Sequence, residues 1–175
     1  MKKIALFCVT ITLLSCKVQQ ILNTGEKENT DLLGLVNKVS FNTSPYNSWF
    51  QQNMKSYRPD TLAINLLQKE LNGIQIKGFM GTWCKDSKRE IPHFFKILEQ
   101  ADFNLDNLEL IAVDRNKKTS NNLQKGFNII RVPTFIFYKK GKEIGRYVEY
   151  ARESLEKDML TIILKQPYKH PYEIY

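Results

Sequence analysis

The chain has 175 residues, of which 42% are hydrophobic and 11% aromatic, with 26 Lys and Arg against 18 Asp and Glu. This composition fits one globular domain with a short extension, and it excludes collagenous, low-complexity and wholly disordered chains, because enough apolar surface is present to offset backbone ordering. Three cysteines are too few for a small disulfide-stapled protein. No apolar run reaches the roughly 18 residues that span a bilayer, which excludes a multi-pass membrane protein.

The N-terminus has the pattern of an export signal. A Lys pair is followed by an apolar stretch over residues 4–14, and Leu13-Leu14-Ser15-Cys16 resembles the lipobox of bacterial lipoproteins. The resemblance implies a signal peptide at 1–15, lipid attachment at Cys16, and a protein anchored to a membrane of the bacterial cell envelope, on its periplasmic or surface side. An uncleaved signal anchor and a signal cut elsewhere are the alternatives. Cleavage before Cys16 would remove Cys8 and leave Cys84 as the one free thiol.

Residues 16–44 are mostly polar and predict a flexible tether. Residues 45–72 predict a helical segment that packs on the following domain. Its first helix, from Pro45 to about Ser56, carries an aromatic cluster for which core packing is favoured over a partner-binding face. Its second helix begins after the N-cap Asp60 and has four leucines on one side, which are Leu62, Leu66, Leu67 and Leu71.

Residues 73–165 alternate between strand and helix patterns, followed by a C-terminal tail at 166–175. The expected elements are strands at 74–81, 108–113, 132–138 and 143–148 and helices at 84–100 and 118–125. A final amphipathic stripe consists of Leu155, Met159, Ile162 and Ile163 and is ended by Pro167. This order predicts an α/β domain with a mixed sheet covered on both faces.

The chemistry centres on Cys84, which is expected at a strand-to-helix junction. Unpaired amide groups and the helix dipole favour an anion there, and therefore the thiolate of a Cys. Lys85 adds to this effect, whereas Asp86 opposes it. Trp83 is expected to pack beside the thiol.

The surrounding residues resemble the thioredoxin superfamily. The carrying motifs, in chain order, are Phe79-Met80-Gly81-Thr82-Trp83-Cys84, Pro92, Leu110-Ile111-Ala112-Val113-Asp114, Arg131-Val132-Pro133-Thr134 and Phe135-Ile136-Phe137 with the Gly141 hairpin. The resemblance implies a thioredoxin-like three-layer sandwich with a mixed sheet, preceded by an N-terminal helical extension.

The resemblance also implies functions for individual residues. Cys84 would be the nucleophile, and Trp83, Arg131, Val132 and Pro133 would form the platform that binds the substrate. Pro133 would be the family's cis proline, with an ordinary trans proline as the alternative. Arg131 could then favour an acidic ligand, although a solvated Arg is the more common case.

Two positions depart from the family pattern. The usual second Cys is Ser87, and the usual buried acid of the preceding strand is Gly78. Ser87 cannot attack a disulfide, so a self-contained dithiol cycle is excluded. Ser87 either stabilises the Cys84 thiolate by a hydrogen bond or starts the helix in a capping pair with Glu90.

The sequence therefore predicts an envelope-anchored protein that exchanges a single thiol with protein disulfides or low-molecular-weight thiols. A redox-inactive module that binds an extended peptide is the main alternative, and a dimer joined through Cys84 is a third. A monomer without cofactor is expected. Metal binding is disfavoured, because Cys84, His93 and His170 are poorly spaced for ligands. Nucleic-acid binding is disfavoured, because the basic residues are scattered.

Overall fold

The structure is a computed structural model and describes residues 31–173. The expected signal peptide, the lipid-attachment residue Cys16 and the first half of the expected tether lie outside these residues. Between residues 31 and 173 there is no helix that is both long and apolar enough to cross a bilayer.

The described residues form strands and helices in the order expected for the central domain. The strands are β1 (Gly34–Val36), β2 (Ile74–Met80), β3 (Leu108–Ala112), β4 (Thr134–Lys139) and β5 (Lys142–Val148). The α-helices are α1 (Asn47–Ser56), α2 (Thr61–Glu70), α3 (Lys85–Gln100) and α4 (Leu155–Ile163), and short 3-10 helices cover η1 (Lys38–Phe41) and η2 (Leu105–Asn107).

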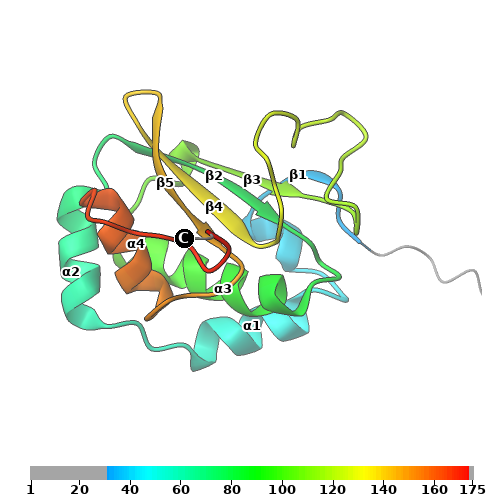
Figure 1. Cartoon of the computed structure of the whole chain (residues 1–175). Coiled ribbons are helices and arrows are strands. Elements are labelled where there is room, and N and C mark those ends of the chain that lie inside the picture. The colour runs from blue at the N-terminus through cyan, green and yellow to red at the C-terminus, as the bar shows by residue number, and fades with distance from the viewer. Residues whose placement is uncertain (1–30, 174–175) are drawn as a thin grey trace, which may run out of the picture.

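The strands make one mixed sheet in the order β1-β3-β2-β4-β5. β2 and β3 are parallel and are connected through α3, while the other neighbouring pairs are antiparallel. Parallel neighbours require such a crossover connection, whereas β4 and β5 need only the tight turn at Lys140 and Gly141. The mixed sheet with flanking helices confirms the expected thioredoxin-like fold class (Figure 1).

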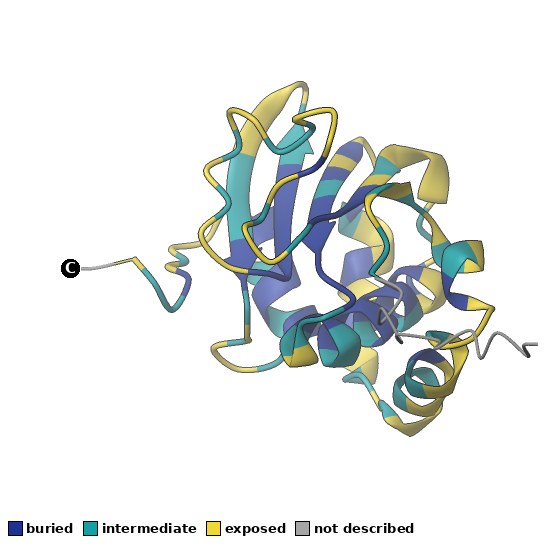
Figure 2. Cartoon of the chain, turned by 90° about the vertical axis from the view of Figure 1, so that its right-hand side faces the viewer, coloured by how far each residue is buried: buried dark blue, intermediate teal, exposed yellow. Residues whose placement is uncertain are grey.

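All four α-helices cover the same face of the sheet (Figure 1). Strand side chains alternate between the two faces, so every second residue of β2 and β4 points toward the helices. Ile74, Ile76, Phe135 and Phe137 do so and join the helix side chains in one large apolar core. In Figure 2 the buried residues lie in the strands and on the helix surfaces that face them.

The opposite face is covered by the segment 113–133, where a short helix at 118–125 was expected. That expectation is wrong, because the segment forms consecutive turns. The Thr119 hydroxyl accepts the Leu123 amide, and Asn122 and Asn128 have φ angles of 55° and 50°. Side chains that bond to nearby backbone in this way compete with helical hydrogen bonds. The small apolar cluster beneath consists of Phe79, Ile111, Val113, Val132 and Ile136.

The tether prediction is wrong for its second half. β1 pairs with β3, and η1 is capped by Asn37, which accepts the Ser40 amide. Phe41 is fully buried and stacks on Phe50 at a centroid distance of 5.0 Å. The second half of the expected tether therefore contributes an edge strand, β1, and a buried core residue, Phe41.

The two N-terminal helices follow the prediction with one correction. Phe50 is buried and its aromatic neighbours pack around the same core, which confirms core packing of the cluster. In α2, capped by Asp60 as expected, Leu62 and Leu66 are 75% and 46% exposed, so the face with four leucines is wrong. The buried face instead consists of Ala63, Ile64, Leu67 and Leu71.

Candidate functional site

Cys84 lies where β2 ends and α3 begins, as expected. It is the N-cap residue of α3, with extended backbone angles, and it is partly exposed. Its thiol donates a hydrogen bond to the carbonyl oxygen of Val132, with 3.2 Å between Sγ and the oxygen. The sulfur therefore faces the loop that precedes β4.

The three residues before Cys84 are held by hydrogen bonds to distant parts of the chain. The Trp83 indole donates to the carbonyl of Val113 at 2.8 Å, which fixes the ring beside the end of β3. The Thr82 hydroxyl donates to Asp31 and accepts the Leu32 amide. Only glycine fits at position 81, because a Cβ there would lie 2.5 Å from the Trp83 ring. The segment before β1 thus helps to position the reactive loop.

Ser87 is fully buried one turn into α3. Its hydroxyl oxygen accepts the Gly81 amide at 3.1 Å, which ties the first turn of α3 to the end of β2. The capping pair with Glu90 does not form, because α3 begins with Cys84 as its N-cap and Ser87 lies inside the first turn. Lys85 is exposed, so its charge is felt through solvent.

Asp86 and Glu90 both receive hydrogen bonds from the same guanidinium. Arg89 contacts Asp86 at 2.8 Å and Glu90 at 2.7 Å. Glu90 is 6% exposed, and burial raises its pKa although Arg89 opposes the rise. Arg89 thereby offsets part of the negative charge that Asp86 brings close to the thiol.

The platform facing the sulfur has the expected backbone form. The Val132–Pro133 peptide bond is cis, as expected from the motif. The Arg131 carbonyl accepts the Thr134 hydroxyl at 2.8 Å, and the Pro133 carbonyl accepts the Glu149 amide at 2.7 Å. These two bonds fix the loop on both sides of Pro133 and keep Val132 next to Cys84.

The site lacks the family's buried acid because Gly78 is tightly packed. A Cβ at Gly78 would lie 2.7 Å from Leu110 and 3.4 Å from Phe135. A carboxylate has no room there, so this position cannot supply an acid for proton transfer to and from Cys84.

Cys84 opens into a hollow of about 230 Å³ between the ends of β2, β3 and β4. Trp83, Arg131 and Val132 line it as expected, together with Arg115, Lys117 and Glu149, which sequence reasoning missed. A signal for Arg115 and Lys117 was available. They directly follow β3, which runs parallel to β2, and the carboxyl ends of parallel strands meet at one edge of a sheet.

The Glu149 carboxylate is close to several charges. Burial raises its pKa and Asp86 adds to the rise, whereas Arg131, with its Nε 4.0 Å away, lowers it. Glu149 is also the residue whose backbone contacts Pro133, so it connects the hollow to the end of β5.

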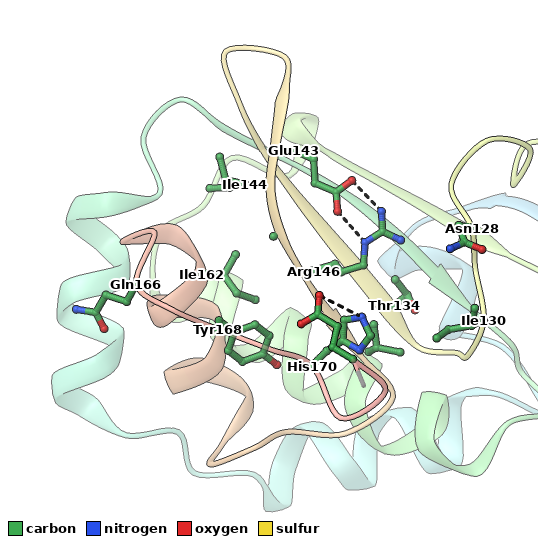
Figure 3. A pocket seen from close by; sticks show the side chains of 13 residues that line it. Asn128, Ile130, Thr134, Glu143, Ile144, Arg146, Ile162, Gln166, Tyr168 and His170 are labelled. Atoms are coloured by element: carbon green, nitrogen blue, oxygen red, sulfur yellow. Dashed lines mark hydrogen bonds and ion pairs between the residues drawn. The ribbon is translucent and has the colours of Figure 1, made fainter. Parts of the chain in front are cut away.

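A larger hollow of about 320 Å³ lies along β5, beneath the C-terminal segment (Figure 3). Its polar groups lie close to one another, since Arg146 contacts Glu143 at 2.7 Å and the His170 ring lies 3.9 Å from the Glu173 carboxylate. Among residues 31–173 no group of three or more His, Cys, Asp or Glu side chains could hold a metal ion.

Comparison with known proteins agrees with this geometry. The thioredoxin family profile matches residues 65–161, which is more than half of the chain. The chain belongs to the thioredoxin family. This fold is generally associated with thiol–disulfide redox chemistry on protein thiols.

Curated relatives include a thioredoxin-like protein of Acanthamoeba polyphaga mimivirus, 30% identical over 54% of this chain and 66% of its own length. Thioredoxin H9 of Arabidopsis thaliana is 29% identical over 54% of this chain and 63% of its own length. The matches thus span slightly less than two thirds of these relatives.

Among solved structures, an HIV epitope-scaffold protein is 16% identical with a TM-score of 0.51, over 69% of this chain and 83% of its own. Fasciola hepatica thioredoxin is 19% identical with a TM-score of 0.38, over 59% and 89%. The likeness to the scaffold protein concerns the fold alone.

Proposed function

We propose that this protein exchanges thiols and disulfides through the single sulfur of Cys84. The observation that carries the proposal is the position of Cys84 at the α3 N-terminus, partly exposed and 3.2 Å from the Val132 carbonyl beside a cis proline. A thiolate at a helix N-terminus is stabilised by the unpaired amides and the helix dipole. Membership of the thioredoxin family agrees with this chemistry.

The proposed exchange has two steps. The Cys84 thiolate attacks one sulfur of a partner disulfide, so that a Cys84–partner bond forms, the partner's own S–S bond breaks and the second sulfur leaves as a thiolate. An external thiolate then attacks the partner sulfur of this mixed disulfide, and Cys84 leaves as a thiolate. The net result is that one thiol of the partner disulfide is replaced by the external thiol, with no other oxidant or reductant.

Ser87 makes the external thiol necessary. In a dithiol protein this position supplies the second sulfur, but a hydroxyl does not attack disulfides. In this chain the Ser87 hydroxyl accepts the Gly81 amide, and we infer that it keeps the first turn of α3 fixed beneath Cys84. Trp83 and Val132 would then contact the partner around the reacting sulfurs.

The test uses the full chain carrying Cys8→Ser and Cys16→Ser, kept in mild detergent, so that Cys84 is the one thiol. The rate of its reaction with a neutral aromatic disulfide is compared with that of a small exposed thiol at the same pH. We expect Cys84 to react at least about tenfold faster. The matched control adds Cys84→Ser and should form no adduct.

A rate no higher than that of the model thiol would overturn the proposal. The binding-module alternative makes a different prediction for Cys84→Ser, because a redox-inactive module would keep its partner after this substitution. Non-reducing electrophoresis of the same protein reports the third alternative, a dimer joined through Cys84.

We further propose that the protein is a lipoprotein of the bacterial cell envelope, with lipid on Cys16. The support is the Leu13-Leu14-Ser15-Cys16 motif after an apolar stretch. In cells fed a clickable fatty acid, the natural chain should be labelled and found in the membrane fraction. Cys16→Ala should lose the label, while Cys84→Ser should keep it, and labelling that survives Cys16→Ala would refute the assignment.

A further inference from the structure

The hollow in front of Cys84 carries more positive than negative charge. Its lining includes three cationic side chains, from Arg115, Lys117 and Arg131, and one carboxylate, from Glu149. Arg131 is largely occupied, because it lies 4.0 Å from Glu149 and its guanidinium stands 5.1 Å from the ring of Tyr172. The excess charge is therefore that of Arg115 and Lys117.

Arg115 and Lys117 belong to the turn that begins at Asp114, whose carboxylate accepts two backbone amides. Neither forms an ion pair with another residue within the described range 31–173. The Arg115 guanidinium lies over the Trp83 ring at 5.4 Å, which brings it to the residue directly before Cys84. The nearby Asp86 is bound by Arg89, which also binds Glu90, so the charge of Asp86 is offset in part.

The turn that presents both cations is held in place before any ligand arrives. The Asp114 carboxylate accepts the amides of Asn116 and Lys118, each at 2.8 Å. The Lys117 amide donates to the Asp114 carbonyl at 2.9 Å, with Lys117 itself at a φ of 60°. A fixed backbone loses little entropy when a ligand binds, so both side chains start from fixed positions on the rim of the hollow.

From these observations we propose that the Cys84 site selects disulfides whose substituents carry carboxylates close to the sulfur. The inference rests on the proposed thiol exchange at Cys84 and specifies its substrate class. A carboxylate beside the attacked sulfur would contact Arg115 and Lys117 while the partner chain lies against Arg131 and Val132. The same chemistry can come from an acidic peptide or from a small anionic disulfide.

The test compares three small disulfides with the single-thiol protein. They are 3,3′-dithiodipropionate, which is a dianion, bis(2-hydroxyethyl) disulfide, which is neutral, and cystamine, which is a dication. Each rate is divided by that of a neutral model thiol, N-acetylcysteinamide, to remove the intrinsic reactivity of the probe. The anion-to-cation ratio is the corrected rate of the dianion divided by that of the dication. At an ionic strength of about 0.01 M we expect this ratio to be about ten or more. At about 1 M, where the Debye length is about 3 Å, it should approach one.

Charge variants assign the preference to residues. The double variant Arg115→Gln and Lys117→Gln should lower the ratio at low salt to about threefold or less. The matched control, Lys140→Gln and Lys142→Gln, removes the same charge from the β4–β5 turn, at the opposite end of β4 from Pro133, and should keep the ratio (Figure 1). Glu149→Gln should raise the ratio, because it removes the one carboxylate of the hollow.

The outcomes separate this inference from the proposed function. If all three probes react no faster than with the model thiol, the thiol-exchange function fails. If the neutral probe reacts fast but the ratio stays near one, or if both double variants lower it equally, the function stands and the substrate class is overturned.

A final pair of probes separates the two sources of carboxylate. These are the disulfide-linked dimers of the tripeptides Glu-Cys-Glu and Gln-Cys-Gln, with blocked ends. The rate of the Glu-Cys-Glu dimer divided by that of the Gln-Cys-Gln dimer is compared with the rate of dithiodipropionate divided by that of the neutral disulfide. A larger ratio for the peptides would assign the carboxylate to an acidic peptide. Equal ratios would assign it to a small anionic disulfide, and a peptide ratio near one together with no small-probe preference would refute the charge selection.

Discussion

The two faces of the sheet differ in what covers them and in what they do. The helix-covered face packs against four helices and includes stacked aromatic pairs such as Phe94 and Phe135, with ring centroids 3.9 Å apart. The opposite face has a far smaller apolar cluster under the turns of residues 113–133. Those same turns carry Arg115, Lys117 and the loop with Pro133. Apolar packing is concentrated on one face, and the proposed site lies at the edge of the other.

The largest effect should come from restoring an acid to the helix-covered face. In Gly78→Asp the new Cβ would lie 2.7 Å from Leu110, and the carboxylate would be buried without a partner. We expect a loss of at least about 3 kcal/mol in the free energy of unfolding, measured by urea denaturation. Gly78→Ala tests the steric part alone and should cost about 1–2 kcal/mol. Equal stability of Gly78→Asp and the natural chain would contradict the packing described for this strand.

Replacing one phenylalanine by alanine on each face tests directly whether the helix-covered face contributes more stability. Phe41→Ala removes a fully buried ring from the helix-covered core and should cost about 3–4 kcal/mol of unfolding free energy. Phe127→Ala, on the turn side, removes a partly buried ring 5.3 Å from Phe79 and should cost less than about 2 kcal/mol. Val39→Ala, at a residue 68% exposed, should be nearly neutral. A neutral Phe41→Ala would restore the tether interpretation for residues 34–44.

Much of the helix-covered face could be predicted, because apolar residues recur along its helices with a clear helical period. The last helix, Leu155–Ile163, buries the four residues of the expected apolar stripe, and Asp60 is the N-cap that was expected. β1 was missed because it has three residues and alternates weakly, so its pairing with β3 is decided by tertiary contacts. The leucine face of α2 failed for a related reason, since residues 62, 66, 67 and 71 span two sides of a helix and only packing chooses between them.

The turn-covered face and the site were harder to predict. Cys84, Trp83, Val132 and the cis Pro133 were placed together by motif order, and the structure brings them together. Glu149 was missed because it reaches the site from the end of β5, through a backbone contact that no local pattern encodes. The helix expected at 118–125 failed because turn-forming side chains outweigh a weak apolar pattern.

A pH effect of intermediate size should come from His93 on the helix-covered face. Its ring stacks on Tyr57 at 3.8 Å, and burial together with the charge of Arg89 lowers its pKa to about 4. The unfolded chain takes up a proton near pH 6.5, whereas the folded chain does so near 4, so the stability is complete above about 6.5 and is lost as the pH falls toward 4.

His93→Phe keeps the stacked ring and removes the titration. Relative to this variant, the natural chain should lose about 1–2 kcal/mol of unfolding free energy between pH 6.5 and 4, because the partly exposed ring is partly screened. Urea denaturation at several pH values measures the difference. The other histidine, His170, is unchanged in both proteins and cancels. A pH-independent difference would show that His93 titrates alike in the folded and unfolded chains.

The smallest effect should come from the one side-chain hydrogen bond that ties Trp83 to the end of β3. Trp83→Phe keeps an aromatic ring beside Cys84 but removes the indole donor, leaving the Val113 carbonyl without that bond. We expect a loss of about 1 kcal/mol in unfolding free energy, and the Val113 carbonyl can recover part of the cost by binding water at the open rim of the hollow. The rate of Cys84 with the neutral disulfide should change less than about threefold, because the α3 N-terminus and the Val132 carbonyl stay in place. A loss above about 3 kcal/mol would mean that Trp83 is part of the core under the turns, and stability would then not be concentrated on the helix-covered face.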